Sequence, residues 1–133
     1  MLDTNMLIYM LKQRPPSVVL KVVQLLSKDP QSLCMSFVTW AELLKGAEHS
    51  IRPEQTRKSL DCLAESVPIL YVVSDAMCRY HAQFSVMLQA RGTPIGSNDL
   101  WIAAHAMASG CTLVTNNQRE FSRIPELVLD NWV

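Results

Sequence analysis

The sequence has no excess of either charge, no long hydrophobic run and no closely spaced pair of cysteines. Lys and Arg number 12 and Asp and Glu also number 12, which excludes a nonspecific polyanion binder and an acidic tail. The longest apolar stretches, such as 6–11 and 69–73, are far shorter than the roughly 18 residues that a membrane span requires. The start, MLDTN, lacks the basic and apolar regions of a secretory leader. We therefore expect no membrane partner and a cytoplasmic location.

The four cysteines include no C-x-x-C pair, so a zinc knuckle or a thioredoxin-type motif is not expected. Hydrophobic residues make up 49% of the 133 residues, enough for one core without disulfides. We expect one domain over residues 1–133, with free and mostly buried thiols. The three histidines share no metal-ligand spacing, so each is expected to be structural.

Short apolar segments alternate with helical patterns along the chain. The expected strands lie at Leu2, 32–36, 68–73, 111–114 and 128–129, and 68–73 is the clearest of them. The expected helices lie at 6–11, from Pro15 to Asp29, from Thr39 to Ala47, from Pro53 to Ala64, from Ser74 to Arg91 and at 100–109, with a short turn ending at Phe121. The segment Thr39-Trp-Ala-Glu42 fits a capping box. No two strands are close enough to form a hairpin, so the fold class is α/β with a parallel sheet covered by helices.

Acidic side chains stand where this sheet would bind a ligand. Ligands of open parallel sheets bind outside the carboxyl ends of the strands, and Asp3, Glu42, Asp99 and the turn 115–117 follow strands or begin helices that can reach that edge. Each acid also has a structural reading. Asp3 can cap the first helix, Glu42 can complete the capping box, and Asp99 can complement a helix dipole.

Three carboxylates at one edge would repel one another. Two carboxylates about 5 Å apart repel by roughly 3 kcal/mol at an effective dielectric constant of about 20, and three by on the order of 10 kcal/mol. A hard divalent cation offsets this repulsion at neutral pH, can polarise a phosphodiester oxygen and lowers the pKa of a bound water. The residues therefore predict a Mg²⁺ or Mn²⁺ site for phosphoryl transfer.

Four segments stand in the order found in a known family: Met1-Leu-Asp-Thr-Asn5, Ser36-x-x-Thr39-x-x-Glu42-Leu-x-x-Gly46, Pro94-Ile-Gly-Ser-Asn-Asp99-x-x-Ile-Ala-x-His105-Ala, and Leu113-Val-Thr-Asn-Asn-x-x-Glu120-Phe121. Together they resemble the PIN-domain ribonucleases and, more narrowly, the VapC toxins of type II toxin-antitoxin pairs. The resemblance covers essentially the whole chain. It implies a single three-layer α/β/α domain, a mostly parallel sheet of about four to five short strands, and a Mg²⁺-dependent endoribonuclease, with Mn²⁺ able to substitute.

The resemblance also implies roles for particular residues. Asp3, Glu42 and Asp99 match the family's catalytic and metal-binding acids, with Asp3 and Asp99 as the direct ligands. Asn117 stands where many relatives carry another acid, and it can hydrogen-bond a metal-bound water without adding charge. The residues expected either to orient these carboxylates or to serve only as caps and turns are Thr4, Asn5, Asn98 and Thr115. Only Met1 and Leu2 precede Asp3, so the strand before it is expected to be very short.

Partners follow from the same resemblance. VapC toxins are neutralised by a VapB antitoxin and commonly form homodimers. The helices 15–26 and 39–44, with Val18, Val22 and Trp40, can form the antitoxin groove or simply pack in the core. The pattern around Asp99 and His105 resembles the subgroup that cuts initiator tRNA in the anticodon stem-loop, which would inhibit translation.

Other functions remain to be weighed. A haloacid-dehalogenase-like phosphatase needs D-x-D where this chain has Asp3-Thr4-Asn5, and a receiver domain needs an acid pair and a late lysine that are absent. A PIN-like module that binds RNA or a partner with weakened or no catalysis stays open because of Asn117. If the pocket gathers three acids, nine remain outside it against 12 basic residues. The candidates for phosphate binding are Lys12, Arg14, Lys45, Arg52, Arg91 and Arg119.

Overall fold

The computed structural model describes all 133 residues. The helices are α1 (Thr4–Lys12), α2 (Pro16–Lys28), α3 (Phe37–Glu48), α4 (Pro53–Ser66), α5 (Asp75–Ala90), α6 (Ser97–Ala108) and α7 (Gln118–Phe121). The strands are β1 (Met35–Ser36), β2 (Ile69–Leu70), β3 (Leu113–Val114) and β4 (Leu129–Asp130). This order confirms the α/β class. No helix is long and apolar enough to cross a membrane.

The sheet is parallel, and its centre is the single residue Leu2, which bridges the strand pairs on either side. Leu2 forms parallel bridges to Met35 of β1 and to Val114 of β3, while β1 pairs with β2 and β3 pairs with β4, both in parallel. The spatial order is therefore β2, β1, Leu2, β3, β4. The expected sheet of about five short strands, with a very short central one, is confirmed.

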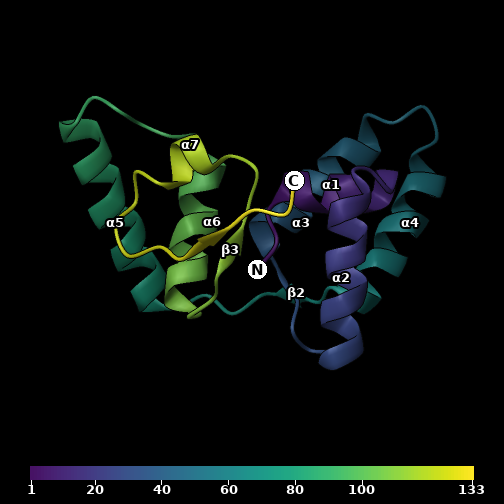
Figure 1. Cartoon of the computed structure of the whole chain (residues 1–133). Helices are drawn as coiled ribbons and strands as arrows, with labels where there is room; N and C mark the ends of the chain where they lie inside the picture. Colours follow the sequence, from purple (N-terminus) through teal and green to yellow (C-terminus); the bar gives the residue numbers. More distant parts are fainter.

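Helices cover both faces of this sheet. Side chains alternate between the two faces along each strand, so apolar side chains on both faces need helices to bury them. Leu2, Met35 and Val114 pack in one hydrophobic cluster with α1, α2, α3 and α4. Met1 and Leu113 pack in a second cluster with α5, α6 and the segment after α7. Figure 1 shows the resulting groups of helices on either side of the strands, α1–α4 on the right and α5–α7 on the left. The three-layer α/β/α arrangement is confirmed.

Several helix starts follow the sequence signals. Asp3 caps α1 by accepting a hydrogen bond from the backbone N–H of Met6 at 2.8 Å, and Ser74 caps α5 in the same way through Met77 N–H at 3.2 Å. Proline occupies the first turn of α2 and of α4, where its missing N–H costs nothing. Helix α6 is buried along most of its length, as its apolar composition predicts.

The capping box at Thr39 is wrong. Helix α3 begins at Phe37, and its cap is Ser36, whose hydroxyl accepts from the Val38 N–H at 3.2 Å. Strand β1 passes directly into α3, so Thr39 lies inside the helix, with its hydroxyl buried and without a partner. Glu42 is therefore released from the capping role and faces another part of the molecule.

The strand expected at 68–73 is shorter than predicted. Only Ile69–Leu70 pairs, with Met35 and Ser36, because β1 ends where α3 begins and leaves no partner for the residues that follow. The continuation at Tyr71, Val72 and Val73 is 60–74% exposed. The apolar run thus predicts a strand, but it does not reveal that β1 is too short to pair with residues beyond Leu70.

Two further expectations need correction. All four cysteines are free, as predicted, but Cys62 and Cys78 are exposed and Cys34 and Cys111 only half-buried, so the thiols are not mostly buried. Val18 and Val22 lie in the core at 0% and 5% exposure, and Trp40 packs against the same cluster. These three side chains form the core rather than an open groove.

Candidate active site

One pocket gathers nearly all the polar residues selected from the sequence. This acidic pocket, of about 310 Å³, lies at the carboxyl ends of the central strands. Its lining residues are Asp3, Thr4, Asn5, Glu42, Lys45, Asn98, Asp99, Asn117 and Phe121. Four separate parts of the chain thus meet there: the start of α1, the middle of α3, the first turn of α6 and the segment after β3.

Asp3 lies at the floor of the acidic pocket and is 4% exposed. One carboxylate oxygen, Oδ1, accepts from the Met6 N–H, and the other, Oδ2, accepts from the Thr115 hydroxyl at 2.5 Å. Burial raises the pKa of Asp3, and the hydrogen bonds from Thr115, Met6 and Asn5 partly offset that rise. Thr115 is itself positioned by the backbone, since its hydroxyl accepts from the Asn117 N–H at 2.9 Å. The two structural contacts orient the carboxylate.

Glu42 lies on α3 and is held from two other helices. Its Oε2 accepts a short hydrogen bond from the hydroxyl of Thr4 on α1, and its Oε1 accepts from the side-chain amide of Asn98 on α6 at 3.0 Å. These contacts tie together the three helices that surround the acidic pocket. The expected orienting roles of Thr4 and Asn98 therefore correspond to observed hydrogen bonds.

Asp99 is in the first turn of α6, where no side chain caps the helix. The pKa of Asp99 is raised to about 6, first by burial and then by the negative charges of Glu42, Glu120 and Asp3, and a hydrogen bond from Asn117 offsets part of the rise. Although the helix dipole favours an acid at this position, burial and the surrounding carboxylates together outweigh it. Asp99 thus forms no ion pair that would favour its ionised form.

Glu120 was not selected from the sequence, although it belongs to one of the quoted motifs. It lies on the short helix α7, three residues after Asn117, and its charge raises the pKa of Asp99. Glu120 therefore brings a fourth carboxylate close to the acidic pocket, although Asn117 itself carries no charge. The signal that could have found it is an acid one helical turn beyond the expected position.

Comparison with known proteins identifies the family of this chain. The family model described as "PIN domain" matches residues 1–127. The chain belongs to the PIN-domain family. It is 43% identical over 132 residues to Ribonuclease VapC1 of Haemophilus influenzae strain R2866, with 99% of this chain and 96% of the relative covered. It is 33% identical over 132 residues to a protein of Salmonella typhimurium named tRNA(fMet)-specific endonuclease VapC, with 99% and 96% covered.

Solved structures also resemble this PIN domain over nearly its whole length. The VapBC-1 structure from nontypeable Haemophilus influenzae matches with a TM-score of 0.88 at 43% identity, covering 98% of this chain and 96% of the solved one. The VapBC2 structure from Rickettsia felis, bound to a promoter DNA fragment, matches with a TM-score of 0.89 at 37% identity, covering 99% and 97%. Within the PIN-domain family, the chain therefore belongs with the VapC ribonucleases.

The donor set of the PIN domain suits a hard divalent cation. The acidic pocket offers carboxylate, amide and hydroxyl oxygens and contains no thiol or imidazole. Oxygen atoms are the ligands that Mg²⁺ and Mn²⁺ prefer. No three His, Cys, Asp or Glu side chains are close enough to hold a metal ion jointly, so a preformed three-carboxylate cage is absent. Mg²⁺ commonly uses one or two carboxylates and completes its shell with water and phosphate.

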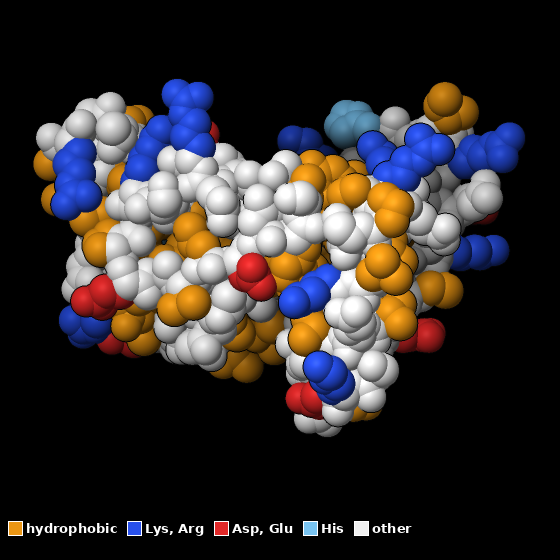
Figure 2. Space-filling model, in the orientation of Figure 1, with side chains coloured by type: hydrophobic (Ala, Val, Ile, Leu, Met, Phe, Trp, Pro, Cys, Tyr) orange, Lys and Arg blue, Asp and Glu red, His pale blue; other side chains and the backbone are white.

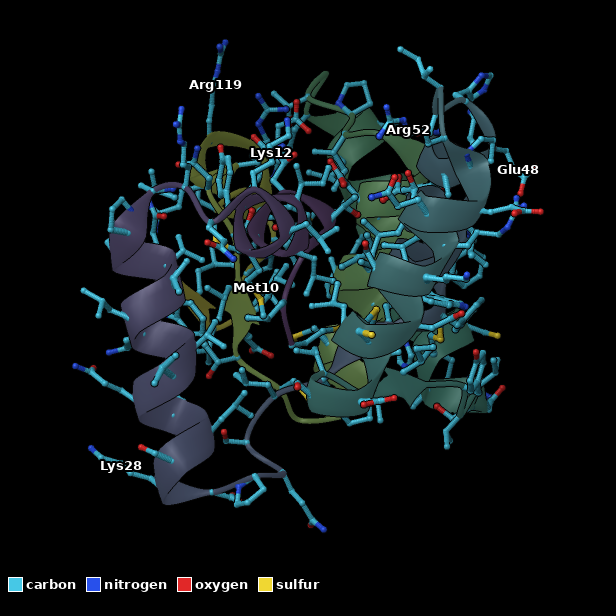
Figure 3. All side chains as sticks on the ribbon, turned by 90° about the vertical axis from the view of Figure 1, so that its right-hand side faces the viewer. Met10, Lys12, Lys28, Glu48, Arg52 and Arg119 are labelled. Atoms are coloured by element: carbon cyan, nitrogen blue, oxygen red, sulfur yellow. The ribbon has the colours of Figure 1, made fainter.

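Basic residues lie near the mouth of the acidic pocket. Lys45 lines it from α3 but forms no ion pair with its acids. Figure 3 shows that Lys12, Arg52 and Arg119 project at the upper end of the molecule, whereas Lys28 lies at the lower end. In Figure 2, Lys and Arg side chains gather along the upper edge on both sides of the central depression. Lys45 is thus the basic residue that lines the acidic pocket.

Proposed function

We propose that this PIN domain is a Mg²⁺- or Mn²⁺-dependent endoribonuclease that acts as a VapC-type toxin. The observation that carries the proposal is the meeting of Asp3, Glu42 and Asp99 in one pocket, where the pKa values of Asp3 and Asp99 are raised. Burial is the first cause of both rises, and neighbouring acids add to it. Titratable groups perturbed in this way cluster at functional sites. The 43% identity to a ribonuclease supports the same activity.

The chain's own residues would divide the work. Asp3 and Asp99 would hold the divalent cation, with Glu42 as the third acid, and Asn117 would hydrogen-bond its water. When bound, the cation would polarise the scissile phosphate and lower the pKa of an attacking water. Thr115 fixes the Asp3 carboxylate, while Thr4 and Asn98 fix Glu42. Lys45 at the pocket wall supplies a positive charge for the RNA phosphate.

The proposed substrate is tRNA, and initiator tRNA in particular. The Salmonella relative carries tRNA(fMet)-specific endonuclease in its name, and a VapBC structure from Salmonella typhimurium matches 99% of this chain with a TM-score of 0.87. Cutting this tRNA in the anticodon stem-loop would stop translation initiation. Because tRNA is a cytoplasmic molecule, we propose the cytoplasm as the site of action.

The proposed partners are a VapB-like antitoxin and a second copy of this chain. Several of the structural relatives were solved as VapBC complexes, which supports an antitoxin for this chain. Leu20 and Val23 are about 60% exposed on α2, so the apolar side chains available for such contacts differ from the buried Val18 and Val22.

A cleavage assay tests the proposal. Purified protein with MnCl₂ is expected to cut a bulk tRNA pool, and Asp99→Asn is expected to abolish cutting because it removes the charge and keeps the shape. The matched control is Asp75→Asn, an exposed acid in the first turn of α5, paired with Arg79, which should cut like the wild type. Sequencing the cleaved RNA ends identifies the target. An uncut pool, or equal cleavage by Asp99→Asn, contradicts the proposal.

The second candidate is binding of RNA without cleavage. It is favoured by Asn117, an amide at a position where many relatives carry an acid. Tight binding of tRNA together with no cleavage in either Mg²⁺ or Mn²⁺ would support this reading over the nuclease.

A further inference from the structure

A second cavity lies beside the acidic pocket, between the outer part of α5 and the start of α6. This side pocket has a volume of about 230 Å³ and is lined by His81, Ser85, Gln89, Pro94, Ile95 and Ser97, among others. Ser97 also lines a shallow depression that contains Glu42, Asn98 and Asp99. The first turn of α6 therefore borders the side pocket through Ser97 and the acidic pocket through Asn98 and Asp99.

An aromatic stack forms one wall of the side pocket. The His81 ring stacks on the indole of Trp101, with ring centroids 3.7 Å apart and an interplanar angle of 20°. His81 covers one face of the indole and lines the cavity, whereas Trp101 does not line it. Burial lowers the pKa of His81, which favours the neutral ring at pH 7. A flat ring entering the cavity can extend this stack by one layer.

The remaining walls combine apolar and hydrogen-bonding groups. Pro94 and Ile95 supply an apolar surface, while the side chains of Ser85, Gln89 and Ser97 supply donors and acceptors. Single-stranded RNA is recognised in just this way, by stacking a base on an aromatic ring, including histidine, and bonding its edges.

We propose that the side pocket binds one unpaired base of the RNA substrate, stacked on His81 and adjacent to the scissile phosphate. The inference rests on the proposed ribonuclease function and adds a base-binding subsite to it. It explains how a domain without a strongly basic surface can select its cleavage site, because a stacked base contributes affinity independent of salt.

Binding without cleavage tests the subsite by itself. The probe is a single-stranded hexaribonucleotide carrying 2-aminopurine at each position in turn, mixed with the protein in EDTA. We expect fluorescence quenching at one position, because stacking quenches 2-aminopurine. His81→Ala should lose the quenching and weaken binding about tenfold, within the range for replacing a base-stacking residue. His81→Phe should restore both, and Gln83→Ala, an exposed change on the same helix, should match the wild type.

A cleavage experiment then distinguishes the two proposals. An abasic nucleotide at the quenched position should lower kcat/KM about tenfold in the wild type and have little further effect in His81→Ala. Equal quenching in the wild type and in His81→Ala, or failure of a folded His81→Phe to restore it, overturns the subsite even if RNA is cut. Position-specific quenching that depends on residue 81, with no cleavage in Mn²⁺, keeps the subsite and overturns the nuclease.

Discussion

The floor and the rim of the acidic pocket each carry an aspartate, Asp3 and Asp99, but the two carboxylates differ in burial and in hydrogen bonding. At the floor, Asp3 is 4% exposed, and both of its oxygens accept hydrogen bonds, from the Met6 N–H and the Thr115 hydroxyl. At the rim, Asp99 is partly exposed in the first turn of α6, and the charged groups that affect its pKa are Glu42, Glu120 and Asp3, all acids. Burial is the first cause of the raised pKa in both.

The difference separates structure from chemistry. The Asp3 carboxylate caps α1 and joins it to the end of β3 through Thr115, so its structural and proposed metal-binding roles depend on the same two oxygens. Asp99 caps nothing, and burial and the neighbouring acids disfavour its ionised form more than the hydrogen bond from Asn117 favours it. Asp3 is therefore expected to stabilise the fold, whereas Asp99 is expected to lower the free energy of unfolding while serving the proposed metal binding.

The largest expected effect comes from removing each acid in turn. Asp3→Ala and Asp99→Ala should both lower RNA cleavage by roughly a thousandfold or more, the effect of losing several kcal/mol of metal-dependent stabilisation. Their effects on folding should be opposite. Asp3→Ala should lower the free energy of unfolding by about 1–3 kcal/mol, through the lost cap and the unpartnered Thr115 hydroxyl. Asp99→Ala should raise it by about 1 kcal/mol at pH 7.5.

Urea unfolding of both variants, beside Asp75→Ala as the control for an exposed first-turn acid, measures this contrast. If both pocket variants were destabilised alike, the proposed difference between floor and rim would be lost. If neither affected cleavage, the proposed site would be wrong.

The second prediction concerns pH and divalent cations. The pKa of Asp99 rises from 3.8 to about 6 on folding, so the folded state binds more protons between pH 4 and 6. The free energy of unfolding should therefore fall as pH rises through that window, by about 1–2 kcal/mol for this partly exposed group, and then level off. Asp3 shifts in the same direction.

Mn²⁺ should reverse this loss, because it binds the ionised carboxylates. Its stabilising effect on the thermal midpoint is expected to be several degrees at pH 7.5 and small at pH 5. Asp99→Asn should flatten the pH dependence and remove most of the Mn²⁺ effect. A Mn²⁺ shift of equal size at both pH values, or in Asp99→Asn, would show that the cation binds elsewhere.

The fold could be predicted from the sequence where the signals are local. The caps at Asp3 and Ser74 and the prolines that begin α2 and α4 depend only on neighbouring residues, and all were confirmed. The length of β2 depends on how far β1 extends, which is a property of the partner strand. The apolar run at 68–73 carries no information on that, so the extension to Val73 was wrong.

The candidate site shows the same division. Four motifs in family order predicted which acids would meet, and the acidic pocket brings them together. The capping role given to Glu42 failed because Thr39 is a helix-interior residue and Ser36 is the cap. Lys45, one of the six basic residues selected for phosphate binding, lines the pocket. Glu120 was missed because its effect on Asp99 arises from the tertiary packing of α7, and an acid one helical turn beyond Asn117 does not by itself reveal that contact.

Thr115→Val provides a smaller change at the floor. Valine keeps the shape of threonine but removes the donor to Asp3 and the acceptor for the Asn117 N–H. The free energy of unfolding should fall by about 1–2 kcal/mol, because two buried polar groups lose their partner. Cleavage should fall about 10- to 100-fold, as for other residues that orient metal ligands. The loss of the hydrogen bond should also raise the pKa of Asp3 further, so the rising limb of the pH–rate profile should move to higher pH.

Thr4→Val is the matched change at the rim and should have the smallest effect. It removes the hydroxyl that donates to Glu42 Oε2, while the Asn98 amide still donates to Oε1. Because Thr4 is only partly buried, water can replace the lost donor, and stability should change by about 0.5 kcal/mol or less. Cleavage should fall no more than about tenfold, with the rising limb of the pH–rate profile unmoved, since Asp3 keeps its partners. The two variants are compared by their kcat/KM on the same RNA. A larger loss in Thr4→Val than in Thr115→Val would mean that the orientation of Glu42, rather than that of Asp3, limits cleavage. The roles given to floor and rim would then have to be exchanged.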